Sequence, residues 1–335
     1  MSERTAVVLL NLGGPDSLDA VEPFLFNLFS DPDIIDFPGS FLFRKKLAKM
    51  ISTRRAPMVE KQYAKIGGKS PIKEYNLRQA ELLEEHLNER VPARVFVAMR
   101  YWHPSTDEAI DAVLAEGITK VILLPLYPQF SKATTVSRTK EWEKRVKERD
   151  LSGKLDVVRI DEYYRDERYI QAIVERVDQG LARFDPSVRD KVTIVFSAHG
   201  TPMKLVRSGD PYSDHIKATV GAVMATGEYK QTHTLCYQSK VGPLKWLEPS
   251  TPDMVDRLAS EGVKHMLIVP IAFTSDHLET LFELNIEYRR VAKAAGIEQY
   301  EMTEGLNDSP TFIDALAGLV FKKLGLETDS KGVAA

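Results

Sequence analysis

The stretch PSTDEAIDAVLAEGITKVILLPL at residues 104–126 recurs, without a gap, as PSTPDMVDRLASEGVKHMLIVPI at residues 249–271. Each copy opens with Ser and Thr, which are typical helix N-caps, continues with a helical pattern that stops at Gly, and ends in an apolar run closed by Pro. Two unrelated helix–strand units can converge on such a pattern. An ungapped match of this length favours duplication of half a domain, so we expect two similar halves.

The rest of the chain also alternates short apolar runs with longer helical patterns, which is typical of α/β proteins with parallel sheets. The predicted strands lie at 6–12, 94–99, 120–126, 155–160, 191–196, 232–237 and 265–272. The clearest predicted helices lie at 76–88, 107–116, 166–184 and 253–261. Because ligands usually bind at the carboxyl ends of parallel strands, we expect two similar α/β halves with the active site in a cleft between them.

The length of 335 residues fits two domains. We predict a first half at 1–150, a connecting strand and helix at 151–190, a second half at 191–325 and a flexible tail at 326–335. Gly13-Gly14 follows the first predicted strand but lacks the spacing of a dinucleotide-binding loop, and no Walker A motif occurs. Nucleotide chemistry is therefore not favoured.

The composition, with 43% apolar and 28% charged residues, is that of an ordinary globular protein. A net charge of -3 argues against general nucleic-acid binding, which needs a basic surface. The lone cysteine, Cys236, cannot form an internal disulfide or hold an iron–sulfur cluster, and it predicts a reducing, cytoplasmic location. No signal peptide is evident, and no apolar run approaches the ~20 residues that span a bilayer.

Two segments of the second half are candidates for chemistry. His199 ends a predicted strand among the small residues of FSAHGTP, which leave room for a ligand, although a hydrogen-bonded histidine in a turn fits equally well. In the second segment, Glu279, Glu283 and Glu287 are spaced to share one helix face. They could form a line that receives cations or relays protons. Alternatively, Asp276 and Glu279 form a capping box and the other carboxylates face water.

An imidazole and a carboxylate that meet at the cleft would suit a transient, borderline metal such as Fe(II). Two protein ligands do not make a closed structural site, so they suit delivery of a metal to a substrate that supplies the remaining ligands. This interpretation requires His199 and Glu279 to converge from two strand ends of the same half.

Residues 34–55 interleave aromatic and basic side chains and suit a surface that touches anionic lipid or a large, flat, apolar anion. An amphipathic helix packed on the core fits the same pattern. We call this segment the lip. Its aromatic and basic residues include Phe37, Phe41, Phe43, Arg44, Lys45, Lys46, Lys49, Arg54 and Arg55.

Long, ordered motifs across residues 5–325 resemble the ferrochelatases, enzymes that insert Fe(II) into a porphyrin to make haem. The matching motifs are LNLGGP at 10–15, QY…IGGKSPI at 62–72, RYWHP at 100–104, YPQFS at 127–131, FSAH at 196–199, SGDPY at 208–212, QSKVGP at 238–243 with Trp246, and PIAFTSDHLETL at 270–281.

The resemblance implies a chelatase-like fold that holds the porphyrin between two Rossmann-like halves. It implies that His199 is the essential histidine and that Glu279 is a carboxylate facing it across the porphyrin, both catalytic and both able to contact the metal. Asp276, Glu283 and Glu287 match a metal or proton path. The positions that match the porphyrin-binding pocket or its rim are Leu12, Arg54, Arg55, Ile72, Tyr127, Ser131 and Trp246.

Some relatives carry a [2Fe–2S] cluster whose first cysteine lies shortly after the Tyr-Pro-Gln segment and whose other three lie in a C-terminal extension. Here no cysteine follows 127–129 until Cys236, so we expect no cluster and no permanently bound cofactor. Fe(II) is then a substrate.

We expect insertion of Fe(II) into protoporphyrin IX, with release of two protons, as the last step of haem biosynthesis. We also expect a monomer that binds no nucleic acid, in the cytoplasm, with peripheral contact to the anionic inner face of the membrane. A coproporphyrin ferrochelatase should lack the apolar lip. Another tetrapyrrole metal chelatase and a two-lobed ligand-binding protein are further alternatives.

Overall fold

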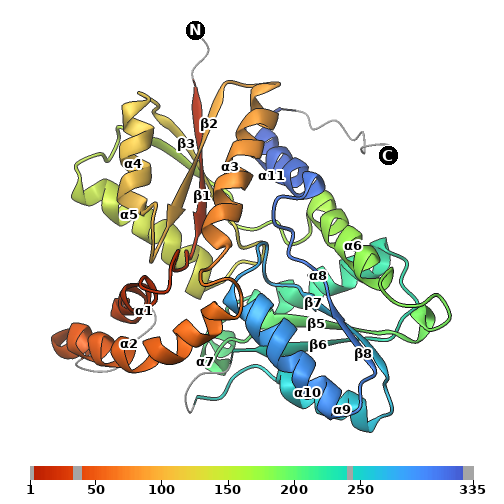
Figure 1. The fold of residues 1–335 in the computed structure, drawn as a ribbon. Helices are drawn as coiled ribbons and strands as arrows, with labels where there is room; N and C mark the ends of the chain where they lie inside the picture. Colours follow the sequence, from red (N-terminus) through yellow and green to blue (C-terminus); the bar gives the residue numbers. More distant parts are fainter. Residues whose placement is uncertain (1–3, 33–39, 240–243, 327–335) are drawn as a thin grey trace.

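A computed structural model describes residues 4–32, 40–239 and 244–326, with the side chains of 40–42 and 136–138 left aside (Figure 1). Its strands form two parallel sheets of four, β2-β1-β3-β4 and β6-β5-β7-β8. The bounds are β1 Thr5–Asn11, β2 Ala93–Met99, β3 Lys120–Pro125, β4 Asp156–Arg159, β5 Thr193–His199, β6 His233–Gln238, β7 His265–Pro270 and β8 Gln299–Met302. The two sheets have the same strand order, which confirms the predicted α/β fold with two similar halves.

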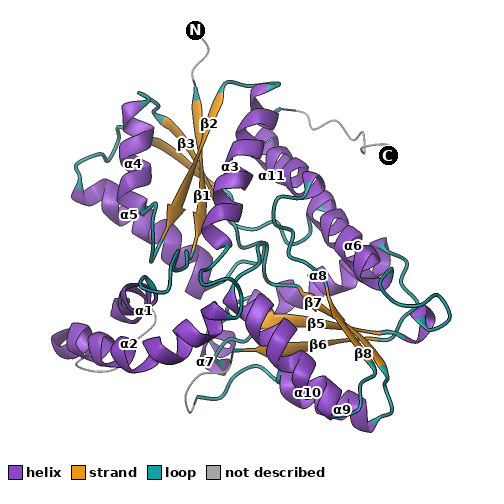
Figure 2. Cartoon of the chain, in the orientation of Figure 1, coloured by secondary structure: helices purple, strands orange, loops and turns teal. Residues whose placement is uncertain are grey.

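Helices cover both faces of each sheet (Figure 2), and for this reason the central strands are buried throughout rather than alternating in polarity. The helices are α1 Val21–Ser30, α2 Ser40–Ala64, α3 Ile72–Asn88, α4 Thr106–Ala115, α5 Ser137–Glu148, α6 Glu167–Leu181, α7 Met203–Arg207, α8 Tyr212–Thr226, α9 Thr251–Ser260, α10 Tyr288–Ala294 and α11 Pro310–Lys323. There are also π-helices η1 Lys132–Val136 and η3 Glu279–Glu287, and a short 3₁₀ helix, η2 Arg189–Lys191.

The repeated stretches fold alike. Ser105 caps α4 and Ser250 caps α9, each accepting a hydrogen bond from the third residue of its helix. Just before each helix, the proline carbonyl accepts a hydrogen bond from the last or next-to-last residue of a strand, Met99 in one half and Tyr237 in the other. A π-helix follows the third strand of each half. These shared local features agree with duplication.

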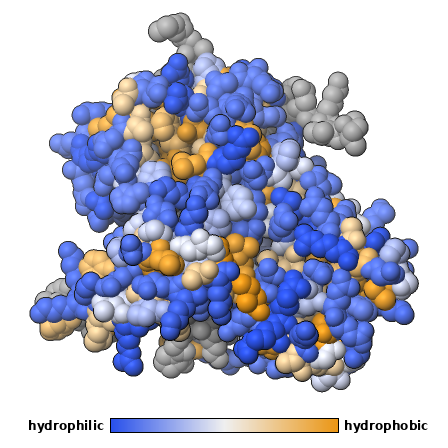
Figure 3. All heavy atoms as spheres, viewed as in Figure 1, coloured by the Kyte–Doolittle hydropathy of each residue, from blue (hydrophilic) through white to orange (hydrophobic). Residues whose placement is uncertain are grey.

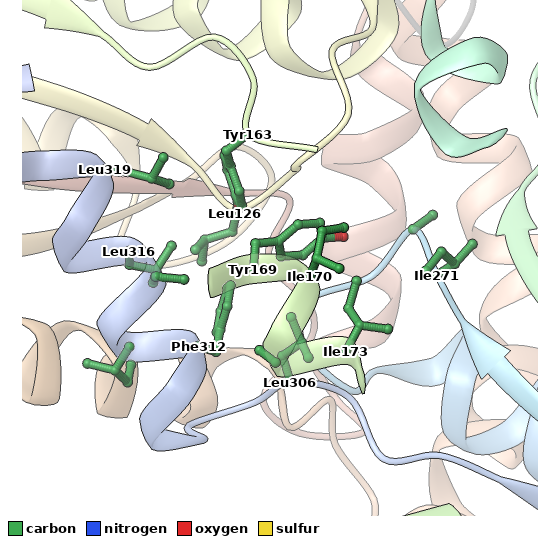
Figure 4. Packing of buried hydrophobic residues seen from close by; sticks show 14 of the residues in the cluster. Leu126, Tyr163, Tyr169, Ile170, Ile173, Ile271, Leu306, Phe312, Leu316 and Leu319 are labelled. Carbon is green, nitrogen blue, oxygen red and sulfur yellow. The ribbon is translucent and has the colours of Figure 1, made fainter. Parts of the chain in front are cut away.

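One hydrophobic core extends through both halves. It contains Val7 and Leu9 of β1 together with Phe196 of β5 and Leu267 of β7. Helices α6 and α11 pack against each other, and Figure 4 shows Phe312 and Leu316 of α11 close to residues of α6 and to Leu126, which follows β3. Helix α11 also packs against α3 of the first half. This shared core fixes how the strand ends of the two sheets face each other.

A separate cluster joins α1 and α2 beside those strand ends. Val21 and Leu25 of α1 pack against Ala56, Val59 and other residues of α2. Leu12, which follows β1, and Leu278, which precedes η3, both pack on this cluster. The C-terminal part of α2 is thereby held next to Leu278, which belongs to the second half.

Candidate active site

His199 is the last residue of β5, at the edge where the site was predicted. Its carbonyl accepts a hydrogen bond from the Tyr212 hydroxyl at 3.0 Å. Gly200 follows because a side chain there would meet the Gln238 carbonyl at 2.8 Å and approach the Trp246 ring. The backbone around His199 is thus packed closely, while its imidazole keeps 40% of its surface exposed.

Glu279 begins the π-helix η3 and lies beside this imidazole. Its Oε2 is 3.8 Å from His199 Nε2. The same oxygen accepts hydrogen bonds from Ser239 Oγ at 2.8 Å and from Gln238 Nε2 at 3.2 Å. Gln238 ends β6 and Ser239 follows it, so the carboxylate is held by residues at the end of the neighbouring strand.

The distance between His199 and Glu279 contradicts the expectation that they face each other across the porphyrin. A flat macrocycle between them needs van der Waals contact on both faces, which is roughly 7 Å in total. At 3.8 Å the two groups lie side by side and address the same face of any ring bound there. A divalent ion with bonds of about 2.1 Å to both atoms fits this separation.

The predicted helix after β7 exists, but η3 has π-helical rather than α-helical hydrogen bonding. The capping-box alternative is wrong, because η3 begins after Leu278 and Asp276 does not cap it. The Asp276 carboxylate instead accepts hydrogen bonds from Gly305 N, Asn307 Nδ2 and Thr280 Oγ1. π-Helical segments occur frequently at functional sites.

Glu283 lies one turn beyond Glu279, and the two carboxylates share a neighbour. Ser239 Oγ is 3.4 Å from Glu283 Oε2, while Tyr288 donates a hydrogen bond of 2.6 Å to Glu283 Oε1. Glu287 ends η3 and is half-buried. The three glutamates therefore follow one helix away from His199, as the spacing predicted, while Asp276 points into a different set of partners.

The surroundings push the pKa values of the first two glutamates in opposite directions. Burial alone would raise the pKa of Glu279, but His199, His277 and the hydrogen bonds from Ser239 and Gln238 outweigh it and lower that pKa. Burial, and then the charge of Glu279, raise the pKa of Glu283. Glu279 thus loses its proton more readily than an ordinary glutamate and Glu283 less readily, and a separation of this kind is typical of groups with different roles in one site.

Sequence reasoning did not select Gln238, Ser239 or His277 as site residues. The first two stand in a quoted motif directly after a predicted strand, so their place at the carboxyl edge was the available signal. His277 packs on Phe273, with ring centroids 4.4 Å apart, and burial lowers its pKa. The imidazole therefore takes up a proton less readily than a free histidine does.

The predicted porphyrin-binding residues are brought partly together. Leu12 packs on the α1–α2 cluster, and Ile72, at the start of α3, lies against Gly14. Tyr127 is half-buried and donates a hydrogen bond to Asn11 at 2.7 Å. Trp246 pairs with Pro202 in an isolated bridge close to Gly200.

Ser131, Arg54 and Arg55 are placed differently. Ser131 is 1% exposed and donates its hydroxyl to Asp210 at 3.0 Å, so its side chain is committed to the fold. Arg54 is exposed on α2, and the Arg55 guanidinium lies over the Phe29 ring at 5.7 Å. Both arginines are therefore on the rim formed by α1 and α2, not at the His199 end of the site.

Among the residues that the structure describes, no three His, Cys, Asp or Glu side chains gather as a metal site. The same residues include no helix that is long and apolar enough to cross a bilayer. His199 and Glu279 therefore have no third side chain of these types gathered with them in the described part of the chain, and their side chains are 40% and 31% exposed.

Comparison with known proteins identifies the family. The ferrochelatase family model matches residues 4–324. The ferrochelatase of Geotalea daltonii is 50% identical over 320 residues, 96% of this chain and 98% of the relative. That of Gloeobacter violaceus is 46% identical over 326 residues, 96% of this chain and 98% of the relative.

Among solved structures, SirB from Bacillus subtilis with Fe³⁺ has the same fold, with a TM-score of 0.55 at 12% identity, over 97% of this chain and 100% of that one. The sequence relationships reach further than fold, because they run at about half identity along almost the whole length. The chain therefore belongs to the ferrochelatase family, metal chelatases of the lyase class that act in haem biosynthesis.

Proposed function

We propose that this protein inserts Fe(II) into protoporphyrin IX to form protohaem, with release of two protons, at a site built on His199 and Glu279. The observation that carries the proposal is their separation of 3.8 Å at the carboxyl edge of the second sheet. An ion held between them keeps its other coordination positions for the pyrrole nitrogens. The metal is then a substrate that passes through an open site.

In this mechanism the metal ion and the pyrrole protons are handled by different side-chain atoms, all on the same face of the porphyrin. Glu279 supplies negative charge, which its lowered pKa maintains, and attracts the divalent ion. His199 either contacts the ion or accepts a pyrrole proton, and a neutral imidazole can do both. Glu283 has a raised pKa and shares Ser239 with Glu279, so it can take a proton onward toward Glu287.

The pocket residues give the ring an apolar enclosure with a basic rim. Leu12, Ile72 and Trp246 offer apolar surface, and Tyr127 offers the face of its ring. Arg54 and Arg55 on the rim can pair with propionate groups, since guanidinium–carboxylate pairs are strong and directional. Ser131 is the exception, because its hydroxyl is donated to Asp210.

We propose protoporphyrin rather than coproporphyrin as the ring. Coproporphyrin carries extra carboxylates where protoporphyrin has vinyl groups, and apolar side chains on α2, including Phe43 and Met50, favour the less charged ring. Phe37 of the predicted lip lies outside the described residues.

The test is direct. The purified protein, mixed anaerobically with Fe(II) and either porphyrin, is followed by its absorption spectrum. We expect metalation of protoporphyrin with kcat/KM at least about 10-fold higher than for coproporphyrin, which corresponds to about 1.4 kcal/mol. Faster metalation of coproporphyrin would overturn the choice of ring. Metalation of neither would overturn the proposed function.

We further propose that no resident cofactor takes part and that the protein acts as a monomer. Burial raises the pKa of Cys236 to about 11, so its thiol is a poor metal ligand.

The exposed face of α2 supports peripheral contact with the cytoplasmic face of an anionic membrane. Phe43, Met50 and Met58 are 61%, 62% and 52% exposed, and their spacing keeps them on one side of the helix. Lys45 and Lys46 are exposed on the same helix. Figure 3 shows, in contrast, a face of the molecule that is largely hydrophilic, with apolar residues in small groups.

Vesicle flotation measures this contact. Replacing Lys45 and Lys46 together with glutamine should weaken binding to anionic vesicles about 30-fold at low salt, from about 1 kcal/mol per lysine. The matched control replaces Lys322 and Lys323 of α11, which are equally exposed, and should bind like the wild type. Equal loss in both variants, or no binding by the wild type, would contradict the proposed surface.

A further inference from the structure

A row of buried polar side chains crosses from the first half to the second and ends at the π-helix. The row begins at Tyr127, one of the predicted porphyrin-binding residues, and reaches Thr280, which directly follows Glu279. Its hydrogen bonds are Tyr127 Oη to Asn11 Oδ1 (2.7 Å), Asn11 Nδ2 to Asn76 Oδ1 (2.8 Å), Asn76 Nδ2 to Gln79 Oε1 (2.9 Å), Gln79 Nε2 to the Asn307 carbonyl (2.6 Å), Asn307 Nδ2 to Asp276 Oδ2 (2.8 Å) and Thr280 Oγ1 to Asp276 Oδ1 (2.9 Å).

From Tyr127 to Asp276 each residue donates to the next one, and Thr280 donates to Asp276 from the other side. Asn76 and Gln79 are 0% exposed, and each accepts through its amide oxygen and donates through its amide nitrogen. Turning either amide over would place donor against donor or acceptor against acceptor. A buried network in which every member is satisfied in only one arrangement favours one geometry strongly. The row therefore specifies how α3 meets the second half.

The far end of the row holds the segment that leads into η3. Asn307 accepts a hydrogen bond from the Asp276 backbone N–H at 2.9 Å through its side-chain oxygen, and donates to the Asp276 carboxylate through its nitrogen. Asn307 has a left-handed backbone, with φ of 48°. Gly305 donates its N–H to the same carboxylate, and a Cβ there would come within 3.0 Å of the Asp276 nitrogen. The loop after β8 thus holds Asp276 through both its backbone N–H and its carboxylate.

The first end of the row, at Tyr127 and Asn11, lies among the predicted porphyrin-binding residues of the first half. Asn11 ends β1, the strand of the first half that corresponds in sheet order to β5, which carries His199. Asn11 also accepts the N–H of Leu12 through the oxygen that accepts from Tyr127. One end of the row therefore fixes the positions of Leu12 and Tyr127, two predicted porphyrin-binding residues. The other end fixes the position of η3, the helix that carries Glu279.

We propose that Gln79 and Asn307 are positioning residues for the metal-insertion reaction. Through this row they hold Glu279 at a fixed place relative to Tyr127 and Leu12, the porphyrin-binding residues predicted in the first half. The inference rests on the proposed function. It gives Asp276 the role of an anchor for η3, since its carboxylate is occupied by three donors. The shared hydrophobic core joins the halves. The polar row fixes the position of α3 relative to the second half, because its hydrogen bonds are satisfied in one arrangement only.

The test uses two variants that break different links. Gln79→Met keeps the side-chain length and removes the donor to Asn307. Asn307→Gly keeps the left-handed backbone and the carbonyl while removing both side-chain bonds to Asp276. Each should lower kcat for Fe(II) insertion between about 10- and 100-fold, the effect of misplacing a reacting group by about 1 Å. Porphyrin affinity, measured by fluorescence, should stay within about threefold, because the pocket walls remain.

The control separates positioning from loss of stability. Leu87→Ala in α3 opens a cavity in the shared core away from the row and should lower the melting temperature while kcat stays within twofold of the wild type. If Gln79→Met does not fold, Asn307→Gly alone decides. Wild-type kcat in the folded variants, or an equal loss of kcat in Leu87→Ala, would overturn the inference. A wild-type protein that metalates neither porphyrin would instead overturn the proposed function.

Discussion

The Glu279→Gln variant is expected to lose Fe(II) insertion by about 10³-fold or more in kcat, while it remains folded and still binds porphyrin. The substitution removes one negative charge and leaves the shape of the side chain. Its oxygen can still accept from Ser239, as the carboxylate does at 2.8 Å. What disappears is the anionic ligand for the ion, and losses of 10²–10⁴-fold are typical when one such group is removed.

Anaerobic metalation kinetics and porphyrin fluorescence measure the two halves of this expectation. Glu298→Gln is the matched control, because Glu298 is exposed and pairs only loosely with Lys264 at 3.6 Å. The control should have wild-type kinetics. Turnover of Glu279→Gln within about 10-fold of the wild type would remove Glu279 from the reaction.

The same variant should show a pH signature in stability. The folded protein lowers the pKa of Glu279 from 4.5, so its ionised form contributes stability above that ordinary value and loses it as the pH falls through the lowered pKa. The wild type should therefore melt at a higher temperature than Glu279→Gln at neutral pH. The difference should shrink toward zero in acid. A gap that widened as the pH fell would contradict the assigned direction.

The fold was largely predictable because its central strands, β1, β3, β5 and β7, are buried on both faces. Each contains an apolar run, such as AVVLL in β1, and seven of the eight strands were predicted. The repeat added the pairing of halves, because a capped helix, a glycine stop and a strand recur in order. Strand β8 was missed, since QYEM is short and mixes polar with apolar residues at a sheet edge.

The candidate site was predicted by residue but not by arrangement. Spacing placed Glu279, Glu283 and Glu287 on one helix, yet the register of π-helical hydrogen bonds depends on tertiary contacts that spacing does not contain. The side-by-side approach of His199 and Glu279 depends on Gln238 and Ser239, which reach Glu279 from another strand. Such contacts come from the topology of the sheet, and a single sequence read locally does not state them.

Asp276 shows the same limit from the opposite side. In the sequence it belongs with the acidic residues that follow it, and both readings offered for it, a cap or part of a path, were local. Two of its three partners in the structure come from about thirty residues further along the chain, at Gly305 and Asn307. The polar row that includes it has members from five separated segments, and nothing in the quoted motifs states that Asn11, Tyr127 and Asp276 are joined through Asn76, Gln79 and Asn307.

The His199→Ala variant is expected to abolish metalation as completely as Glu279→Gln, at least about 10³-fold in kcat, because it removes the base or metal ligand that stands 3.8 Å from the carboxylate. The imidazole is 40% exposed, so its removal should leave the melting temperature nearly unchanged. His233→Ala is the matched control, since His233 begins β6 at the opposite edge of the same sheet and is exposed. That control should have wild-type kinetics.

Addition of free imidazole distinguishes chemistry from architecture in His199→Ala. Removing the side chain leaves a space between Phe273, whose ring lies 6.4 Å from that of His199, and the carboxylate of Glu279. Imidazole at tens of millimolar should enter this space and restore part of the rate in His199→Ala, but not in Glu279→Gln, where the missing group is an anion. Near wild-type turnover without imidazole would exclude His199 from the reaction. Rescue of both variants alike would show that imidazole acts from solution, and that the side-by-side pair does not divide the work between a nitrogen and an oxygen.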